Sequence, residues 1–355
     1  MFEFCKGLRN CLQWKKSTFN LYNTPQMENV TLKRIAELLG LSISTVSRAL
    51  KNHPDISAAT KKRVSEIAEF LDYEPNINAI NLRAKSNRVL GLIVPTISGF
   101  FYDSFIAAVE EECRMNDYRL MILQSGNDPQ IEINNLSICR QNRVSGLFVC
   151  LSTNTSSMSA FDKFKEADIP LIFFDKVPDG DNYNKVCIAD MEAAKMAAEQ
   201  LIKKNKKRIL SLFGNQSLSI SRRRLEAYNN TMLREQDVEI LVAHCSSTQD
   251  ARNITKEYFS KKEKPDAVFC MSDEILIGVM KSLNEMKIDI PAKAGVISLS
   301  DGFLPTIYTP EITYIETSGY KLGKLAFTRM MNCMDGKMEP VELFTSSHAV
   351  NGGSL

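Results

Sequence analysis

The chain has 355 residues, which suits two or three domains better than one, and its hydrophobic fraction of 44% is ordinary for a globular protein. It contains no run of about 18 apolar residues, so no membrane-spanning helix is expected. The formal net charge is +2, but residues 1–88 hold 14 Lys and Arg against 8 Asp and Glu, whereas the remainder holds 30 against 34. A basic N-terminal part on an acidic body is compatible with a small module for an anionic partner joined to a larger domain.

The nine cysteines form no C-x-x-C pair and no Cys/His cluster, so we expect no metal and no cofactor. Five of them lie in apolar runs, where buried free thiols are expected: Cys113, Cys139, Cys150, Cys187 and Cys270. This cysteine usage indicates a reducing, cytoplasmic compartment.

Residues 1–26 carry basic side chains but lack the apolar stretch of 7–15 residues that a signal peptide needs. Two interpretations remain open for this segment. It is either a dispensable extension, with the compact protein beginning near Met27, or an arm that contacts DNA phosphates.

Three short helices are predicted between Thr31 and Leu71. Gly40 directly follows the first apolar stripe, where a left-handed residue ends a helix, and Ser42 is suited to cap the next helix. The third helix should begin after Ser57. The inward-facing residues are Leu32, Ile35, Ala36 and Leu39 in the first helix, Val46, Ala49 and Leu50 in the second, and Val64, Ile67, Ala68 and Leu71 in the third. A helix, a short turn with Gly and a second helix form the helix-turn-helix pattern.

Pro75 interrupts the helical pattern, and Asn76 is suited to cap a short segment, Ile77 to Ala84. A helix of this length is unstable in isolation, so we expect it to order only when it packs on something.

From Val89 onward, buried-strand patterns alternate with helical patterns of 10–15 residues, which predicts parallel sheets in doubly wound α/β units. One series ends near Ala189 and a second begins at Asp190, which suggests two lobes. Ligands of such sheets bind outside the carboxyl ends of the strands, so the loops that follow the strands are the candidate site.

Four stretches resemble the head of the LacI/GalR family of bacterial transcription regulators: VTLKRIAELLGLSISTVSRALKN, ISAATKKRV, LDYEPNINAINLRAKS and RVLGLIVP. The resemblance runs from about Val30 to the final strand. It implies a small all-α helix-turn-helix head with a hinge helix, followed by a two-lobed α/β core like that of periplasmic binding proteins, with parallel sheets. We therefore predict an extension at 1–26, a helix-turn-helix domain at 27–75, a hinge at 76–87 and a core at 88–355. Within the core, the first lobe is expected at about 88–188 plus 317–337, and the second at about 189–316 plus 338–355.

The outward face of the second helix, with no acidic residue, is the predicted DNA surface. Ile43, Ser44 and Arg48 are the candidate base-reading residues, and Arg48 alone has the donor fork for guanine, although a phosphate contact is the alternative. Leu82 matches the hinge leucine that the family inserts into the minor groove; ordinary packing is the alternative. The remaining candidates for DNA contact are Thr31, Ser42, Thr45, Ser47, Lys51, Ser57, Thr60, Asn76 and Ala79.

Effector-binding candidates follow the predicted strands. Phe101 and Tyr102 match the family's effector-packing aromatic position, although an aromatic cluster here is also compatible with core packing. Asp175 suits hydroxyl recognition or a turn cap, and Arg224 matches a ligand-contacting Arg whose planar fork suits hydroxyls or a carboxylate. Ser272 and Asp273 match a polar residue followed by Asp, and the Asp is equally suited to cap a helix.

One departure concerns the family's Gly-Tyr-Asp at the end of strand 295–300, where this chain has Ser298, Leu299 and Ser300. The aligned ligand carboxylate is thus a serine, with Asp301 as its acidic neighbour. We keep both Ser300 and Asp301 as effector-binding candidates.

The resemblance implies a homodimeric, cytoplasmic regulator that binds a pseudo-palindromic operator in double-stranded DNA, does not contact a membrane, and responds to a small effector between the lobes. We predict a repressor of sugar-utilisation genes with a sugar or sugar derivative as effector. An activator, or a co-repressor system for a purine or another metabolite, is the main alternative. A solute-binding protein would lack the head, and no P-loop, G-x-S-x-G or H-E-x-x-H motif supports an enzyme.

Overall fold

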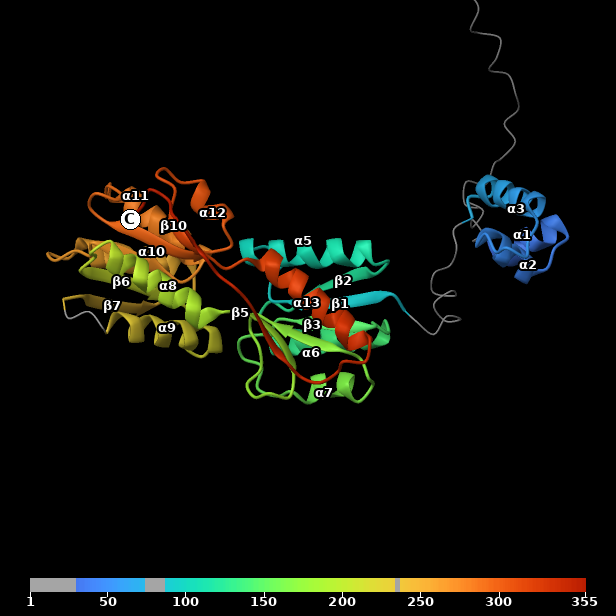
Figure 1. The fold of residues 1–355 in the computed structure, drawn as a ribbon, viewed down its shortest axis with the longest axis horizontal. Helices are drawn as coiled ribbons and strands as arrows, with labels where there is room; N and C mark the ends of the chain where they lie inside the picture. Colours follow the sequence, from blue (N-terminus) through green and yellow to red (C-terminus); the bar gives the residue numbers. More distant parts are fainter. Residues whose placement is uncertain (1–29, 74–86, 234–236) are drawn as a thin grey trace, which may run out of the picture. The chain divides into compact units, whose positions relative to one another are not determined.

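The computed structural model describes residues 30–73, 87–233 and 237–355, which fall into two compact units (Figure 1). The first unit lies within Met1–Ala84 and the second spans Lys85–Leu355. Most of the predicted hinge at 76–87 lies outside the described residues, so its boundaries stay a prediction.

The first unit contains the three predicted helices, α1 (Leu32–Leu39), α2 (Ile43–Leu50) and α3 (Ala58–Phe70). Each begins at a hydroxyl side chain that accepts a hydrogen bond from the amide three residues on: Thr31, Ser42 and Ser57. Gly40 ends α1 with φ 65°, a left-handed conformation that glycine adopts without a side-chain clash.

The core of this unit is made of the apolar stripes predicted from helical spacing. Its buried members are Ile35, Ala36, Val46, Ala49, Val64 and Ala68, and the other predicted inward residues pack around them. The helix-turn-helix prediction is therefore confirmed at the level of individual core residues.

The first lobe of the second unit is built on a six-stranded parallel sheet with the order β11-β5-β4-β3-β1-β2. Its strands are β1 (Val89–Val94), β2 (Arg119–Gln124), β3 (Gly146–Val149), β4 (Leu171–Phe174), β5 (Asn184–Ile188) and β11 (Glu342–Thr345). The inner strands read as continuous apolar runs because helices cover both faces of the sheet.

Four helices cover the first sheet. α5 (Phe100–Met115) and α13 (Gly319–Met334) pack on one face, and α6 (Pro129–Gln141) and α7 (Ser159–Lys165) pack on the other. A side chain at Gly319 would place its Cβ 2.3 Å from the carbonyl oxygen of Phe101, so the start of α13 lies directly against α5.

The second lobe is built on a second sheet with the order β12-β10-β9-β8-β6-β7, in which the short β12 is antiparallel to β10. Its strands are β6 (Arg208–Phe213), β7 (Glu239–His244), β8 (Ala267–Cys270), β9 (Gly295–Ser300), β10 (Thr313–Glu316) and β12 (Ala349–Val350).

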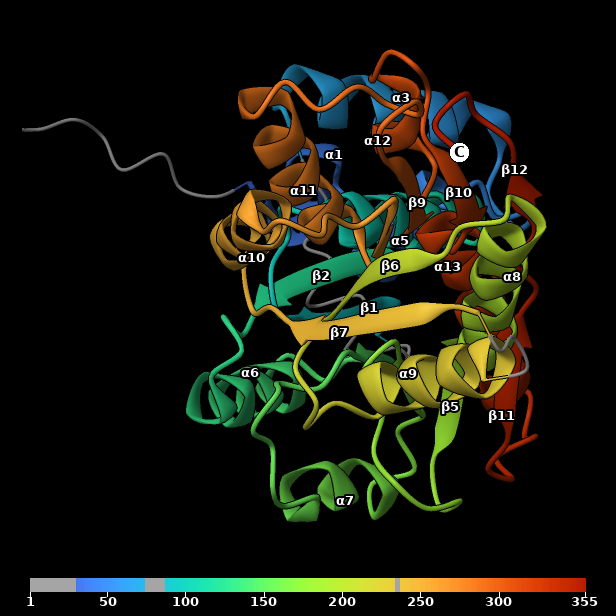
Figure 2. The ribbon, with the colours of Figure 1, turned by 90° about the vertical axis from the view of Figure 1, so that its left-hand side faces the viewer.

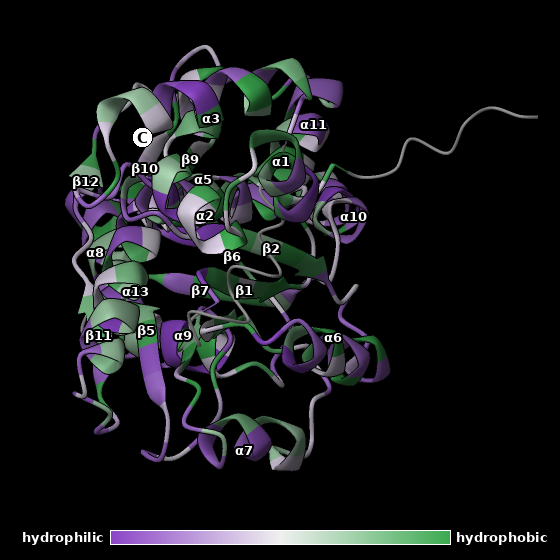
Figure 3. Cartoon of the chain, turned by 90° about the vertical axis from the view of Figure 1, so that its right-hand side faces the viewer, coloured by the Kyte–Doolittle hydropathy of each residue, from purple (hydrophilic) through white to green (hydrophobic). Residues whose placement is uncertain are grey.

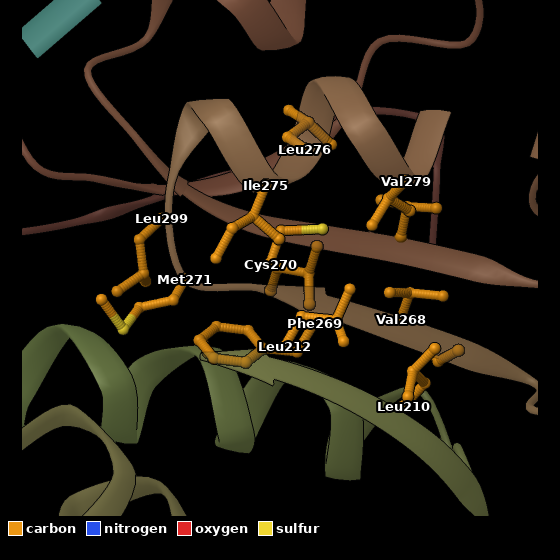
Figure 4. Packing of buried hydrophobic residues seen from close by; sticks show 14 of the residues in the cluster. Leu210, Leu212, Val268, Phe269, Cys270, Met271, Ile275, Leu276, Val279 and Leu299 are labelled. Carbon is orange, nitrogen blue, oxygen red and sulfur yellow. The ribbon is translucent and has the colours of Figure 1, made fainter. Parts of the chain in front are cut away.

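Helices sandwich this sheet as well: α8 (Asp190–Lys203) and α9 (Ser219–Met232) pack together, as do α10 (Thr248–Ser260) and α11 (Asp273–Glu285). Figure 4 shows Ile275 and Val279 of α11 directed toward β8, the strand that carries Val268 and Cys270. A short helix, α12 (Phe303–Thr306), follows β9. The two parallel-sheet lobes confirm the predicted α/β architecture.

The chain passes between the lobes three times: after β5 into α8, after β10 into α13, and between β11 and β12 (Figures 1 and 2). The prediction that residues 338–355 belong wholly to the second lobe is wrong for β11, which pairs with β5 in the first sheet. The sequence pattern identified a strand at 341–346 but could not identify its partner. The short strands β10 and β12 were not predicted.

Residues in the described ranges include no helix long and apolar enough to cross a membrane. Hydropathy colouring shows the strands β1 and β2 as hydrophobic, while the helices carry hydrophobic and hydrophilic bands (Figure 3). The five cysteines predicted to be buried free thiols are all buried and free. No group of His, Cys, Asp and Glu within the described residues is arranged to hold a metal ion.

Candidate DNA-binding face and effector pocket

The outward face of α2 presents the side chains predicted to contact bases. Ile43, Ser44, Arg48 and Lys51 are exposed, and Ser47 is partly buried. Over residues 30–73, the charged groups of Arg48 and Lys51 form no ion pair, whereas Arg34 lies 3.8 Å from Glu37. Both unpaired cations are therefore available to an external anion.

The hydroxyls predicted to contact phosphates also organise the helix starts. Ser42 Oγ accepts from the amide of Thr45 at 3.1 Å and lies 2.8 Å from both Ser44 Oγ and Thr45 Oγ1. Ser57 Oγ accepts from the amide of Thr60 at 3.2 Å, and Thr31 Oγ1 accepts from the amide of Arg34 at 3.3 Å. Helix N-termini favour anions through their free amides and dipole, so these three starts suit phosphate groups.

The remaining DNA-contact candidates, Asn76, Ala79 and Leu82, lie outside the described residues. Their roles stay predictions.

A cavity of about 430 Å³ lies between the two lobes. Its walls come mainly from loops after the carboxyl ends of strands in both sheets, where a ligand of a doubly wound sheet is expected. Seven of the eight effector-binding candidates line it: Phe101, Tyr102, Asp175, Arg224, Ser272, Asp273 and Asp301.

In the first lobe, Asp175 is held by two neighbours. Tyr102 Oη donates to Asp175 Oδ2 at 2.9 Å, and the thiol of Cys150 lies 3.6 Å from the same oxygen. Burial and the Asp175 charge hold the pKa of Tyr102 well above its usual value, so its hydroxyl remains a donor. Asp175 has φ 57°, a left-handed conformation that turns the chain sharply at the end of β4.

In the second lobe, Arg224 lies on α9 in a buried ion pair. Its Nη2 lies 2.8 Å from Asp190 Oδ1, its Nε donates to the same oxygen at 2.9 Å, and its Nη1 donates to the carbonyl of Met271 at 3.1 Å. Asp190 was not among the effector-binding residues predicted from the sequence. Its position directly after a predicted strand was the available signal, the same one that selected Asp175.

Ser300 is the one effector candidate that does not line the cavity. It is 1% exposed, and its hydroxyl donates to Asp273 Oδ1 at 2.5 Å. The amide of Asp301 donates to Asp273 Oδ2 at 3.1 Å. The carboxylate of Asp273 thus accepts from both Ser300 and Asp301 at the end of β9, and Asp301 lies at the cavity wall. The alternative predicted for Asp273 was that it caps α11. Ser272 caps this helix instead, because its hydroxyl accepts a hydrogen bond from the amide of Ile275.

Both units of the chain match known protein families. The family described as "Bacterial regulatory proteins, lacI family" matches residues 31–76. The family described as "Periplasmic binding proteins and sugar binding domain of LacI family" matches residues 87–348, most of the chain. The chain belongs to the LacI family. It is therefore a DNA-binding transcriptional regulator with an effector-binding core, as the resemblance predicted.

Individual LacI-family relatives match almost end to end. RegA, a transcriptional regulator of Clostridium acetobutylicum, is 29% identical over 87% of this chain and 94% of its own length. PurR, a transcriptional repressor of Vibrio atlanticus, is 24% identical over 88% of this chain and 95% of its own length. The family consists of transcriptional regulators, a class that is generally not enzymatic.

Solved structures share the fold. A Lac repressor dimer bound to operator and the anti-inducer ONPF has a TM-score of 0.82 at 20% identity, covering 92% of this chain and 99% of that one. A complex of the regulator CelR with cellobiose has a TM-score of 0.67 at 20% identity, covering 92% of this chain and all of that one.

The residues of this LacI-family pocket that were not selected from the sequence include Asn127, Thr153 and Lys176. Asn127 Oδ1 accepts from Lys176 Nζ at 3.1 Å and from Thr153 Oγ1 at 3.2 Å, which joins three loops of the first lobe at the cavity wall. All three residues follow strands of the first sheet. The expectation that ligands bind outside the carboxyl ends of the strands would therefore have selected them if every such loop had been considered.

Proposed function

We propose that this LacI-family regulator is a homodimeric repressor of sugar-utilisation genes, and that a small effector between the lobes controls its operator binding. The cavity carries the proposal, because it lies between two lobes joined by three chain crossings and is lined by both. Its mixture of aromatic, hydroxyl and carboxylate side chains suits a compact ligand rich in hydroxyls. The structural neighbour in complex with cellobiose is consistent with a sugar.

For DNA recognition, we propose that Arg48 reads a guanine and that Ile43 and Ser44 contact neighbouring base edges. Ile43 is an exposed apolar side chain at the first position of α2, suited to contact a thymine methyl group. The hydroxyls at the helix starts, together with Lys51, would contact phosphates and fix the position of the head. Leu82 in the proposed hinge helix would enter the minor groove.

The proposed switch is a two-state change in the angle between the lobes. An effector that binds one angle more tightly shifts the population toward it, and this shift alters the spacing of the two hinge segments of a dimer. A regulator that works on chromosomal DNA must reach it, so we propose a cytoplasmic location.

A second copy of the chain is the proposed partner of the exposed edge of the first lobe. β2 is the terminal strand of its sheet and exposes Ile122. On α6, which covers the opposite face of the sheet from Ile122 at this edge, Ile131 and Ile138 are exposed two turns apart on one helix face. An exposed edge strand with apolar neighbours is an aggregation hazard unless another chain covers it. An Ile122→Asp and Ile138→Asp double variant should therefore be monomeric and lose operator affinity.

The function is tested by selecting operators from a genomic fragment library with the full-length protein. Anisotropy titrations would follow, with and without monosaccharides, disaccharides, sugar phosphates, uronic acids and purines. We expect a pseudo-palindromic site and at least one sugar that releases it. A ligand that tightens binding would favour the co-repressor alternative, and failure to enrich any DNA sequence would contradict the proposal.

A further inference from the structure

Arg224, the more buried of the two cations that line the effector pocket among the described residues, already has a carboxylate partner. Two nitrogens of the Arg224 guanidinium lie 2.8 and 2.9 Å from one oxygen of Asp190, and a third donates to the Met271 carbonyl at 3.1 Å. Arg224 and Asp190 are each only 6% exposed, so water does not screen this pair. Burial raises the pKa of Asp190, whereas the adjacent Arg224 guanidinium opposes this shift and favours the ionised carboxylate. The pair therefore presents little net positive charge to a ligand.

The remaining charges on the wall are mostly negative. Asp175, Asp273, Glu274 and Asp301 line the cavity, and Lys176 is the one other lining cation among the described residues. Lys176 directs its ammonium to Asn127 Oδ1 at 3.1 Å. An anionic ligand would thus lose its hydration shell beside four carboxylates, and Lys176, whose partner is a neutral amide, is the one lining cation in the described ranges without a carboxylate partner.

The acceptors on the wall suit hydroxyl donors. Asp175 receives hydrogen bonds from Tyr102 and from the Cys150 thiol, and a carboxylate has room for about four. Glu274 is exposed at the start of α11, and its carboxylate has no side-chain partner in the described part of the chain. Because ionised carboxylates can only accept hydrogen bonds, they favour ligands whose groups donate hydrogen bonds.

We propose that Asp190 determines the specificity of this pocket: by neutralising Arg224, it makes the pocket select uncharged, hydroxyl-bearing ligands and reject phosphorylated sugars and sugar acids. The inference rests on the proposed function, because it concerns the same cavity. It narrows the effector class to neutral sugars and related polyols. Asp190 acts through Arg224 and is a positioning residue.

The test measures binding of inorganic phosphate and glucose 6-phosphate to the full-length protein by ³¹P line broadening and calorimetry. Wild type, Asp190→Asn and Asp190→Asn/Arg224→Met are compared at constant ionic strength. We expect Asp190→Asn to bind both probes at least tenfold more tightly than wild type, because Arg224 loses its counter-charge. The double variant should return to the wild-type value, which separates pocket binding from weak binding to the basic head.

Glu192→Gln is the matched control, since Glu192 is exposed on the same helix two residues beyond Asp190. Three outcomes would overturn the proposal: no gain in Asp190→Asn, a gain that persists without Arg224, or wild-type binding of either probe that Arg224→Met abolishes. If circular dichroism shows that Asp190→Asn does not fold, Asp175→Asn replaces it, because Asn tolerates the left-handed backbone found there. That variant should also gain phosphate binding, by at least threefold, and no gain would overturn the proposal equally.

Operator binding without ligand is measured in parallel on the same preparations. If wild type does not bind the operator, the proposed function is contradicted. The phosphate titrations test the role of Asp190 in ligand selection independently of DNA binding.

Discussion

The hydroxyl of Ser104 donates to Asp301 Oδ1 at 2.8 Å and thereby joins the two lobes, because Ser104 lies on α5 and Asp301 follows β9. The amide of Gly319, at the start of α13, donates to the same oxygen at 2.5 Å. A single carboxylate of the second lobe thus holds the first turn of two helices of the first lobe. It also lines the effector cavity, so ligand binding and lobe contact share a side chain.

Replacing Asp301 with Ala removes the acceptor that Ser104 and Gly319 share. We expect amides in the first turn of α13 to exchange about tenfold faster in the variant, corresponding to about 1.4 kcal/mol of lost local stability. Hydrogen exchange with mass spectrometry measures this. Glu311→Ala, at an exposed position in the same lobe, is the control. Equal exchange in wild type and Asp301→Ala would show that other contacts hold the start of α13.

Tyr102→Phe deletes the hydroxyl that donates to Asp175 at 2.9 Å and leaves the ring in place. Removing one partner of a charged hydrogen bond costs about 1–3 kcal/mol of interaction free energy. We therefore expect the affinity for the sugar identified in the anisotropy titrations to fall about tenfold. Tyr183→Phe is a matched control, because Tyr183 donates to Asp162 at 2.8 Å in the same lobe, outside the cavity. Calorimetry should show the loss only in Tyr102→Phe. Equal affinities in both variants would remove Asp175 from the proposed ligand contacts.

The stability of the core should depend on the protonation of Asp273. Burial raises the pKa of its carboxyl from 3.8 to about 6, although the hydrogen bonds from Ser300 and Asp301 oppose the shift. At pH values between 3.8 and about 6, the folded state binds more protons than the unfolded state. The stabilising contribution is therefore complete below about pH 3.8 and is lost as pH rises through 6.

Asp273→Asn removes this proton linkage while its amide can keep contacts to Ser300 and Asp301. Urea unfolding from pH 4.5 to 7.5 should give a free-energy difference, wild type minus variant, that falls with rising pH. The slope is limited to one proton, about 1.4 kcal/mol per pH unit. Parallel pH profiles for the two proteins would contradict the assignment.

Arg48→Ala should reduce affinity for the selected operator by about 1–3 kcal/mol, and should weaken binding to unrelated DNA much less. Arg48→Lys should recover charge but not base selectivity, because lysine lacks the two-pronged donor geometry. Arg34→Ala, which removes a cation already paired with Glu37, is the control. Anisotropy titrations at several salt concentrations separate the two effects. A uniform loss on all sequences would identify Arg48 as a phosphate contact.

Much of this architecture could be predicted because it depends on local periodicity. The stripe of Ile35 and Ala36 and the position of Gly40 specify a helix and its end without reference to the rest of the chain. Asp175 and Asp273 could be placed at one cavity because each follows a strand of a parallel sheet, and the carboxyl ends of strands in both sheets border that cavity.

The remaining features depend on partners distant in sequence. β11 has an ordinary strand pattern, but only pairing with β5 determines which lobe it joins. Likewise, Arg224 was predicted as a ligand contact from its match to the family's Arg, and nothing in that match revealed Asp190 as its partner. The inward position of Ser300 has the same origin, since it depends on the carboxylate of Asp273 in another loop.

The three chain crossings also constrain the order in which this protein can form during translation. The strands β1 to β5 leave the ribosome first, but α13, which covers one face of their sheet, and β11, which completes its edge, are made only after β6 to β10. The growing chain must therefore hold an incomplete first sheet, with β5 unprotected, while the second lobe assembles. Premature termination anywhere before β11 leaves that edge uncovered, and such fragments are expected substrates for chaperones and proteases.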